Sequence, residues 1–124
     1  MGQVMLRGIR GATTANSNTS QEIISATRDL VLEMVSENCI EKENIAAVYF
    51  SVSPDLNAAF PAEAAREIGW KDVPLFCSVE IDVPHALQKC IRIMMLVNTD
   101  RGQKEIKHTY LRDARKLRED LADT

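Results

Sequence analysis

The segment that most constrains the fold is residues 90–97, which are apolar at every position except Arg92. A run this short, rich in large and β-branched side chains, predicts a buried strand rather than a helix. Arg92 is costly there, because a guanidinium keeps its proton and needs an anionic partner in a low-dielectric site. The run itself contains no acid. The partner is therefore either a distant carboxylate of this chain or an anionic ligand.

Length and charge limit the kinds of protein that this chain can be. Its 124 residues, 45% of them hydrophobic, are enough for one domain over residues 1–124 whose core needs no disulfide or metal. Its 15 basic and 18 acidic residues are mixed along the sequence and give a net charge of −3. A basic footprint for nucleic acid and a polybasic membrane arm are both missing from this pattern. We expect neither nucleic acid nor a membrane as a partner.

The cysteines and the N-terminal residues bear on localisation. Cys39, Cys77 and Cys90 are odd in number and have no CxxC spacing, which favours a reducing compartment. The first residues lack the charged and then apolar pattern of a signal peptide, and no apolar stretch is long enough to span a bilayer. We therefore expect a cytoplasmic protein.

Strand and helix patterns alternate along most of the chain. Residues 4–14 predict a strand with two glycines, where a backbone or a ligand comes close. Thr19 and Glu22 form a capping box for a helix to about Asn38, which carries an apolar stripe at helical spacing. The remaining expected elements are strands at 45–53, 73–79, 90–97 and 106–111, a short helix from Pro61 to Gly69, and a turn or short helix at 84–88.

The C-terminal residues 112–124 differ in composition from the rest of the chain. They are mostly charged, and Leu117 and Leu121 are their only large apolar residues. Burial of two leucines cannot anchor such a segment, so we expect a mobile tail whose order comes from a partner, a ligand or the rest of the fold.

The inventory of reactive side chains removes several classes of enzyme. His85 and His108 lie far from the spaced thiols or carboxylates of a zinc site. No GxSxG elbow marks a nucleophilic serine, and no glycine-rich loop between strand and helix can hold a nucleotide phosphate. Strand arginines remain: Arg10 and Arg92 would present rigid forks that bind a carboxylate. Exposed arginines are usually solvated, and we expect this of Arg28, Arg101, Arg112 and Arg115.

Glu80 follows the apolar strand at 73–79 and is the acid of most interest. It could neutralise Arg92, or it could accept a hydrogen bond from a hydroxyl group of a substrate. Sequence spacing alone does not separate these two roles.

Segments spread over almost the whole chain match one known family in order. They are Arg7-Gly8-Ile9-Arg10-Gly11-Ala12-Thr13-Thr14, Ser53-Pro54-Asp55-Leu56, Phe60-Pro61-Ala62, Arg66-Glu67, Val73-Pro74, Cys77, Glu80, Lys89-Cys90-Ile91-Arg92-Ile93-Met94-Met95, His108-Thr109-Tyr110-Leu111 and Leu117-Arg118. Through them the chain closely resembles the monofunctional chorismate mutases of the small trimeric α/β type. No single segment is specific, but so many in one order are.

The resemblance implies a fold and a reaction. The fold is α+β, with helices on one face of a mixed β-sheet, and three copies form a homotrimer with a pseudo α/β barrel and active sites at the subunit contacts. The reaction is the rearrangement of chorismate to prephenate in phenylalanine and tyrosine biosynthesis, which requires no nucleophile, metal or cofactor. Catalysis then depends on holding the reactive conformer and on stabilising charge at the ether oxygen.

The resemblance also implies a role for each site residue. Arg92 donates to the ether oxygen and to a substrate carboxylate, Arg10 binds the side-chain carboxylate beside Tyr110, and Glu80 holds the ring hydroxyl. The other implied substrate-binding residues are Cys77, chiefly through its backbone, the apolar walls Phe60, Ala62, Leu75, Phe76 and Leu117, and the arginines Arg66 and Arg118 near the mouth.

Two positions depart from the family pattern, and two other functions stay open. Glu63 stands where a lysine is expected near the entrance, and Phe76 is larger than the hydroxyl residue expected there. The Glu63 charge should weaken steering of a dianionic substrate unless Arg66 or Lys71 compensates. The alternatives are an imine-deaminase-like or non-catalytic trimeric carboxylate-binding protein, and an interaction module in which Arg92 only pairs with Glu80.

Overall fold

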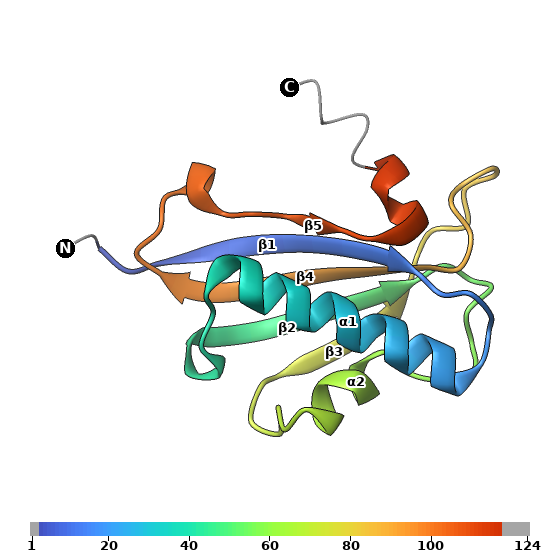
Figure 1. Cartoon of the computed structure of the whole chain (residues 1–124), viewed down its shortest axis with the longest axis horizontal. Coiled ribbons are helices and arrows are strands. Elements are labelled where there is room, and N and C mark those ends of the chain that lie inside the picture. Colours follow the sequence, from blue (N-terminus) through green and yellow to red (C-terminus); the bar gives the residue numbers. More distant parts are fainter. Residues whose placement is uncertain (1–2, 118–124) are drawn as a thin grey trace.

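The computed structural model describes residues 3–117. Its elements are β1 (Met5–Thr14), α1 (Ser20–Asn38), the 3₁₀ turn η1 (Lys42–Asn44), β2 (Ile45–Val52), α2 (Ala62–Glu67), β3 (Leu75–Val79), β4 (Cys90–Thr99), the 3₁₀ turn η2 (Gln103–Glu105), β5 (Thr109–Tyr110) and the 3₁₀ turn η3 (Arg112–Ala114). Figure 1 shows α1 lying across the sheet, with α2 beside β3.

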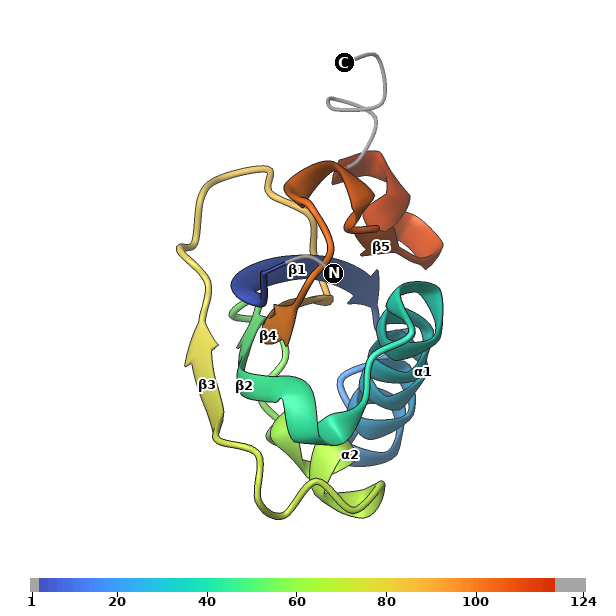
Figure 2. The same cartoon turned by 90° about the vertical axis from the view of Figure 1, so that its left-hand side faces the viewer.

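The strands form one mixed sheet in the order β3-β2-β4-β1-β5. β4 pairs antiparallel with both β1 and β2, while β3 joins β2 and β5 joins β1 in parallel. Figure 2 shows α1 and α2 on the same side of this sheet. The expected α+β fold, with helices on one face of a mixed sheet, is therefore confirmed.

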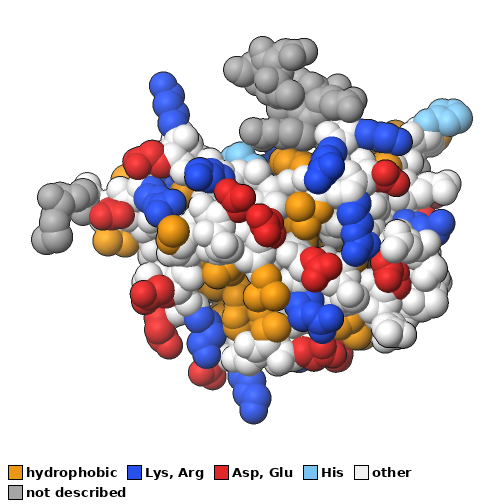
Figure 3. Space-filling model, viewed as in Figure 1, with side chains coloured by type: hydrophobic (Ala, Val, Ile, Leu, Met, Phe, Trp, Pro, Cys, Tyr) orange, Lys and Arg blue, Asp and Glu red, His pale blue; other side chains and the backbone are white. Residues whose placement is uncertain are grey.

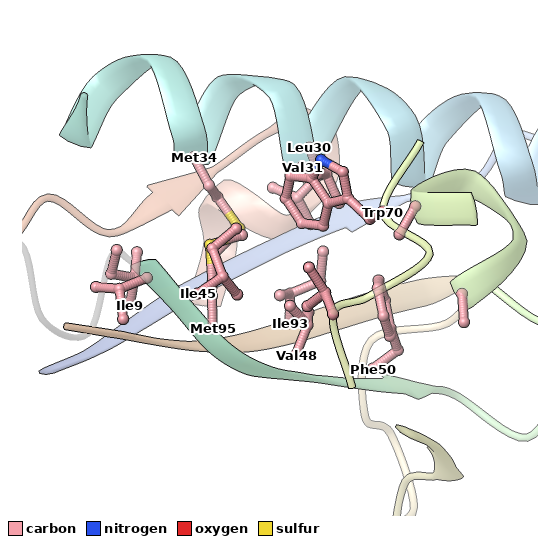
Figure 4. Packing of buried hydrophobic residues seen from close by; sticks show 14 of the residues in the cluster. Ile9, Leu30, Val31, Met34, Ile45, Val48, Phe50, Trp70, Ile93 and Met95 are labelled. Atoms are coloured by element: carbon pink, nitrogen blue, oxygen red, sulfur yellow. The ribbon is translucent and has the colours of Figure 1, made fainter. Parts of the chain in front are cut away.

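The helix α1 forms as its sequence pattern predicts, and it covers the core. Thr19 Oγ1 accepts the N–H of Glu22 at 3.2 Å, which caps the first turn. Leu30, Val31 and Met34 are fully buried and point onto the sheet, where Figure 4 shows them above residues of β1, β2 and β4. Burial of side chains of this size contributes about 1.5–3 kcal/mol each. The apolar stripe therefore fixes α1 to one face of the sheet.

One glycine permits this close packing of helix on sheet. A Cβ atom added at Gly11 would collide with the Met34 side chain and would meet Cδ1 of Leu30 at 3.2 Å. The expectation that glycine in β1 marks a close approach is thus confirmed at Gly11, where the approaching element is α1.

The strand at residues 90–97 is buried on one face only, which corrects the expectation of burial on both. Ile91, Ile93 and Met95 lie under the helices, with at most 3% of their surface exposed. Arg92 is half-buried and Met94 is exposed, because they project from the opposite face, which no element of the described chain covers. Arg92 is therefore less costly in this chain than full burial would make it.

Residues 84–88 contain a turn, the first of the two predicted alternatives, and no helix. The last expected strand differs from the structure. The last strand is limited to Thr109–Tyr110. Just before it, the side-chain amide of Asn38 in α1 bonds both backbone groups of Lys107: Nδ2 donates to the carbonyl and Oδ1 accepts the N–H, each at 2.9 Å. Those bonds occupy the backbone N–H and carbonyl of residue 107 that would otherwise extend the ladder.

The helix-covered face carries no concentrated charge. On the face seen in Figure 3, acidic and basic side chains are interspersed around a group of hydrophobic ones. None of the helices within residues 3–117 has the length and the apolar character needed to cross a bilayer.

Candidate active site

The register of the sheet places Arg92 between two small side chains. In β4, Arg92 pairs with Ala12 of β1 on one side and with Ser51 of β2 on the other. Directly paired residues point to the same face of a sheet. The guanidinium therefore lies over the open face with room on both sides, and its side chain is 35% exposed.

Glu80 reaches Arg92 because β3 continues the same ladder. Ser78 of β3 pairs with Ser51, and the N–H of Glu80 donates to the carbonyl of Val52 at 2.8 Å. Glu80 is two residues beyond Ser78 and so projects from the same face. Its Oε2 accepts a hydrogen bond from Ser51 Oγ at 2.6 Å and lies 3.4 Å from Arg92 Nε. The sequence-distant carboxylate that Arg92 requires is thus present.

This pairing leaves Arg92 only partly satisfied. Its Nε atom is shielded from solvent and makes no hydrogen bond with any described residue. The 3.4 Å contact with Glu80 is an ion pair whose geometry is too poor for a hydrogen bond. A buried donor without an acceptor is unfavourable, so the guanidinium retains the capacity to bind a further anionic or accepting group.

A cavity of roughly 260 Å³ opens beside Arg92; we call it the Arg92 cavity. Arg10 lies on the same face as Ala12, two residues away in β1, and Tyr110 of β5 pairs with Ala12. The Arg92 cavity is lined by Arg10, Gly11, Ala12, Tyr49, Phe50, Ser51, Ser78, Glu80, Arg92, Ile93, Met94, Tyr110 and Leu117. Two arginines, one carboxylate and two phenols therefore line one cavity, which suits a small anion that also carries hydroxyl groups.

A network of hydrogen bonds fixes the backbone just before Arg92. Both carboxylate oxygens of Asp55 accept the N–H of Lys89, at 3.1 and 2.9 Å. Ser53 donates to Asp55 and accepts the N–H of Cys90 at 2.8 Å. The start of β4 is therefore anchored two residues ahead of the guanidinium.

The other predicted site residues lie outside the Arg92 cavity, around α2 and β3; we call this group the α2–β3 edge. It comprises Phe60, Ala62, Arg66, Leu75, Phe76 and Cys77. Phe60 and Phe76 are 67% and 62% exposed, and Arg66 makes an ion pair with Glu63 at 3.2 Å. None of these six residues lines the Arg92 cavity within the described chain, although the Phe76 ring packs edge-to-face against Tyr49, which does line it.

The two thiols nearest these residues are poor nucleophiles. Burial raises the pKa of the Cys77 thiol, although the backbone of Ala62 hydrogen-bonds to it and opposes the shift. Burial likewise raises the pKa of Cys90, against the opposing charge of Arg92. Both thiols are therefore protonated at neutral pH, which agrees with a reaction that needs no covalent intermediate.

The segment after β5 begins with an anchored arginine. Arg112 donates to the carbonyl of Thr14 at 2.9 Å and to Glu22 Oε1 at 3.0 Å, so it is not the solvated side chain that was expected. These bonds fix η3, and Leu117 follows into the lining of the Arg92 cavity. Arg118 lies outside the described residues.

Sequence reasoning missed eight lining residues, namely Gly11, Ala12, Tyr49, Phe50, Ser51, Ser78, Ile93 and Met94. The signal was present for Ser51 and Ser78, which are hydroxyl residues within otherwise largely apolar strands. Their partners became apparent only from the pairing of β2 with β3 and β4.

Comparison with known proteins assigns the chain to a family. The model of the family "Chorismate mutase type I" matches residues 6–121. The chain is 46% identical to chorismate mutase AroH of Bacillus subtilis (strain 168), over 98% of this chain and 96% of that protein. It is 50% identical to chorismate mutase AroH of Thermus thermophilus, over 94% and 97% of the respective chains.

The fold agrees with a solved relative. The structure of chorismate mutase from Clostridium thermocellum superposes with a TM-score of 0.87 and 51% sequence identity, over 88% of this chain and 97% of that chain. The match in sequence and the match in fold thus each cover most of the chain. The chain belongs to the type I chorismate mutase family.

Proposed function

We propose that this chain converts chorismate to prephenate in the Arg92 cavity, as a homotrimer whose active sites lie at subunit contacts. Family membership makes the chain a chorismate mutase, an isomerase of aromatic amino-acid biosynthesis, rather than an imine-deaminase-like or non-catalytic protein. The assignment of roles to individual residues is our proposal. The observation that carries it is Arg92, a lining residue of the cavity whose shielded Nε atom has no hydrogen bond to any described residue.

The roles follow from what the reaction requires. One molecule breaks its ether bond while a carbon–carbon bond forms, so the protein must hold a compact conformer and stabilise charge at the ether oxygen. Arg92 supplies that charge, held in place by Glu80. Arg10 and Tyr110 bind the side-chain carboxylate, and Glu80 accepts a hydrogen bond from the ring hydroxyl.

A single chain supplies only part of this site. The Arg92 cavity, at roughly 260 Å³, is at the small end for a ligand site, which usually has about 300–1,000 Å³. The α2–β3 edge exposes Phe60 and Phe76, and Val79 beside them is 64% exposed. β3 is also an edge strand of the described sheet. We propose that the α2–β3 edge of a neighbouring copy closes the cavity and adds Arg66 to the mouth.

The same proposal covers the terminal residues and the location of the protein. Leu117 lines the cavity, and we propose that Arg118 after it contributes to capture of the dianion. Residues 1–124 are proposed to act as one domain. All three cysteines are free thiols, which supports the proposed cytoplasmic location.

Mixing two inactive variants tests the shared site. Arg92→Ala disables the cavity, and Arg66→Ala disables the edge that we assign to the neighbouring copy. After the two are unfolded and refolded together, about a quarter of the contacts in random trimers join two intact halves. Loss of chorismate absorbance should then recover to about that fraction of the wild-type rate.

The outcome decides between two arrangements. If each chain held a complete site, mixing would restore no activity, since every chain in the mixture carries one defect. Sedimentation of the wild-type protein as a monomer at assay concentration would also contradict the proposal. A wild-type chain that leaves chorismate unchanged would contradict the activity itself.

A further inference from the structure

The backbone of Arg10 is held by a histidine ring where a carbonyl group would be expected. The N–H of Arg10 donates to Nδ1 of His108 at 3.0 Å. Arg10 lies in β1, and His108 immediately precedes β5. This bond therefore joins two strands that each supply a residue to the Arg92 cavity, namely Arg10 and Tyr110.

The His108 ring can accept this hydrogen bond because the ladder between β1 and β5 ends before residue 10. The strands pair only at Gly11 with Thr109 and at Ala12 with Tyr110. Continued parallel pairing would direct the N–H of Arg10 to the carbonyl of residue 107. That carbonyl instead accepts a hydrogen bond from Nδ2 of Asn38, a buried residue at the end of α1.

The contact exists in only one protonation state of His108. A backbone N–H can only donate, so Nδ1 must carry a lone pair and the ring must be neutral. Protonation would place a second donor against the N–H of Arg10 and break the bond. Imidazole groups ordinarily change charge between about pH 5 and 8, so this loss falls within a range that assays can reach.

Charged groups from α1 and from the ring's own segment share one hollow with it. Glu33 and Glu37 of α1 line the same shallow hollow as His108, with Lys107 and Tyr110 from its own segment. From β1, the facing group is the N–H of Arg10 itself. The two carboxylates favour the protonated ring, whereas the N–H of Arg10 and Lys107 favour the neutral one.

We propose that His108 is a positioning residue for substrate capture. Its neutral ring fixes the backbone of Arg10 against the strand that carries Tyr110, and its protonation releases that strand contact. The proposal rests on the function proposed above, in which Arg10 and Tyr110 bind the side-chain carboxylate of chorismate. The present proposal adds His108, which does not touch the substrate. Through its protonation, His108 makes the capture of chorismate dependent on pH.

Two variants separate the acceptor from the ring. His108→Phe keeps a ring of similar size without an acceptor, and His108→Asn keeps an acceptor at the δ position that does not titrate. At neutral pH, His108→Phe should raise KM about five- to tenfold, the effect of losing one ordinary hydrogen bond, with kcat within about twofold of wild type. His108→Asn should restore the wild-type KM.

The pH profile supplies a readout that a purely structural role would not move. Wild-type kcat/KM should fall toward the His108→Phe value as the pH is lowered through the titration of His108, whereas His108→Asn should lack this decline. The inference would be overturned by wild-type KM in His108→Phe, or by an unchanged acid decline in His108→Asn.

A measurement without substrate keeps this inference separate from the proposed function. In a nitrogen-15 NMR titration of the wild-type protein, the amide resonance of Arg10 should move with the ring resonances of His108 and not with those of His85, the other histidine. An amide resonance that stays constant through the His108 titration would overturn the inference, even if the enzyme were active. An inactive wild-type protein would instead overturn the proposed function and leave this contact to be decided by the titration.

Discussion

Oε2 of Glu80 lies 3.4 Å from Nε of Arg92 and accepts the hydroxyl hydrogen of Ser51. One carboxylate oxygen therefore balances the strand arginine and is itself held by the neighbouring strand. The guanidinium is oriented before any ligand arrives, and its charge is not fully satisfied. Such a fixed cation stabilises charge that develops during a reaction, because it needs no reorganisation at that moment.

Replacing Arg92 should remove most of the activity and leave the fold intact. Loss of one preorganised donor typically lowers kcat by about 10²–10³-fold, and a charged donor by more. Steady-state assays of Arg92→Ala, with circular dichroism as the check on folding, measure this. Arg28→Ala is the matched control, because Arg28 makes only an exposed ion pair with Glu67 on the helix side. A kcat near the wild-type value in Arg92→Ala would contradict the assigned role.

Adding a methyl group at Gly11 should destabilise the protein by about 1–3 kcal/mol, the usual effect of overpacking a core. The new Cβ would collide with the side chain of Met34, a fully buried residue of α1. Gly8→Ala is the matched control in the same strand, since its nearest neighbour is the flexible Met94 side chain at 3.2 Å. Urea unfolding of both variants measures the difference. Equal stabilities would show that α1 shifts freely at Gly11.

The helix α1 could be predicted from the sequence because its signals are local. Thr19 caps it as expected, and its buried stripe follows the spacing of the sequence. The reciprocal half of the capping box did differ. Glu22 accepts the N–H of Asn16 and the guanidinium of Arg112, not the N–H of Thr19. Contacts from residues distant in sequence thus altered a motif that local spacing alone had suggested.

The site could be predicted only as far as residue type and family resemblance allow. The sequence and the resemblance predict site roles for Arg10, Glu80, Arg92, Tyr110 and Leu117, and the structure places these five around one cavity. Their meeting depends on strand register, since a shift of one residue would turn Arg92 to the helix side. Because residues 90–97 are apolar on both faces, their pattern does not specify the register. The orienting role of Ser51 and the bond of His108 to Arg10 are therefore not predictable from the sequence.

Acid should destabilise the wild-type protein partly through Glu22. The hydrogen bonds from Asn16 and Arg112 lower the pKa of this carboxyl below its ordinary value. Its stabilising contribution is therefore complete above the ordinary carboxyl pKa and is lost as the pH falls through the lowered, folded-state pKa. In thermal unfolding over the acid range, Glu22→Gln should show a smaller decline in Tm than wild type.

The control for this acid effect is Glu41→Gln, which removes one carboxyl from an exposed position and should keep the wild-type decline. If Glu22→Gln and wild type declined in parallel, the contacts of Glu22 with Asn16 and Arg112 would not be a source of acid sensitivity.

Replacing Cys39 by glycine should stabilise the protein. Cys39 ends α1 in the left-handed conformation, with φ 50° and ψ 49°, and its N–H bonds to carbonyls of the last turn. A side chain in this conformation costs about 1–2 kcal/mol, and glycine avoids that cost, which is why it is common at this position. Cys39→Ala is the matched control, since it removes the exposed sulfur but keeps the Cβ atom. Urea unfolding should find Cys39→Gly more stable than Cys39→Ala by about 1 kcal/mol, and equal stability would mean that the helix end relaxes to another conformation without penalty.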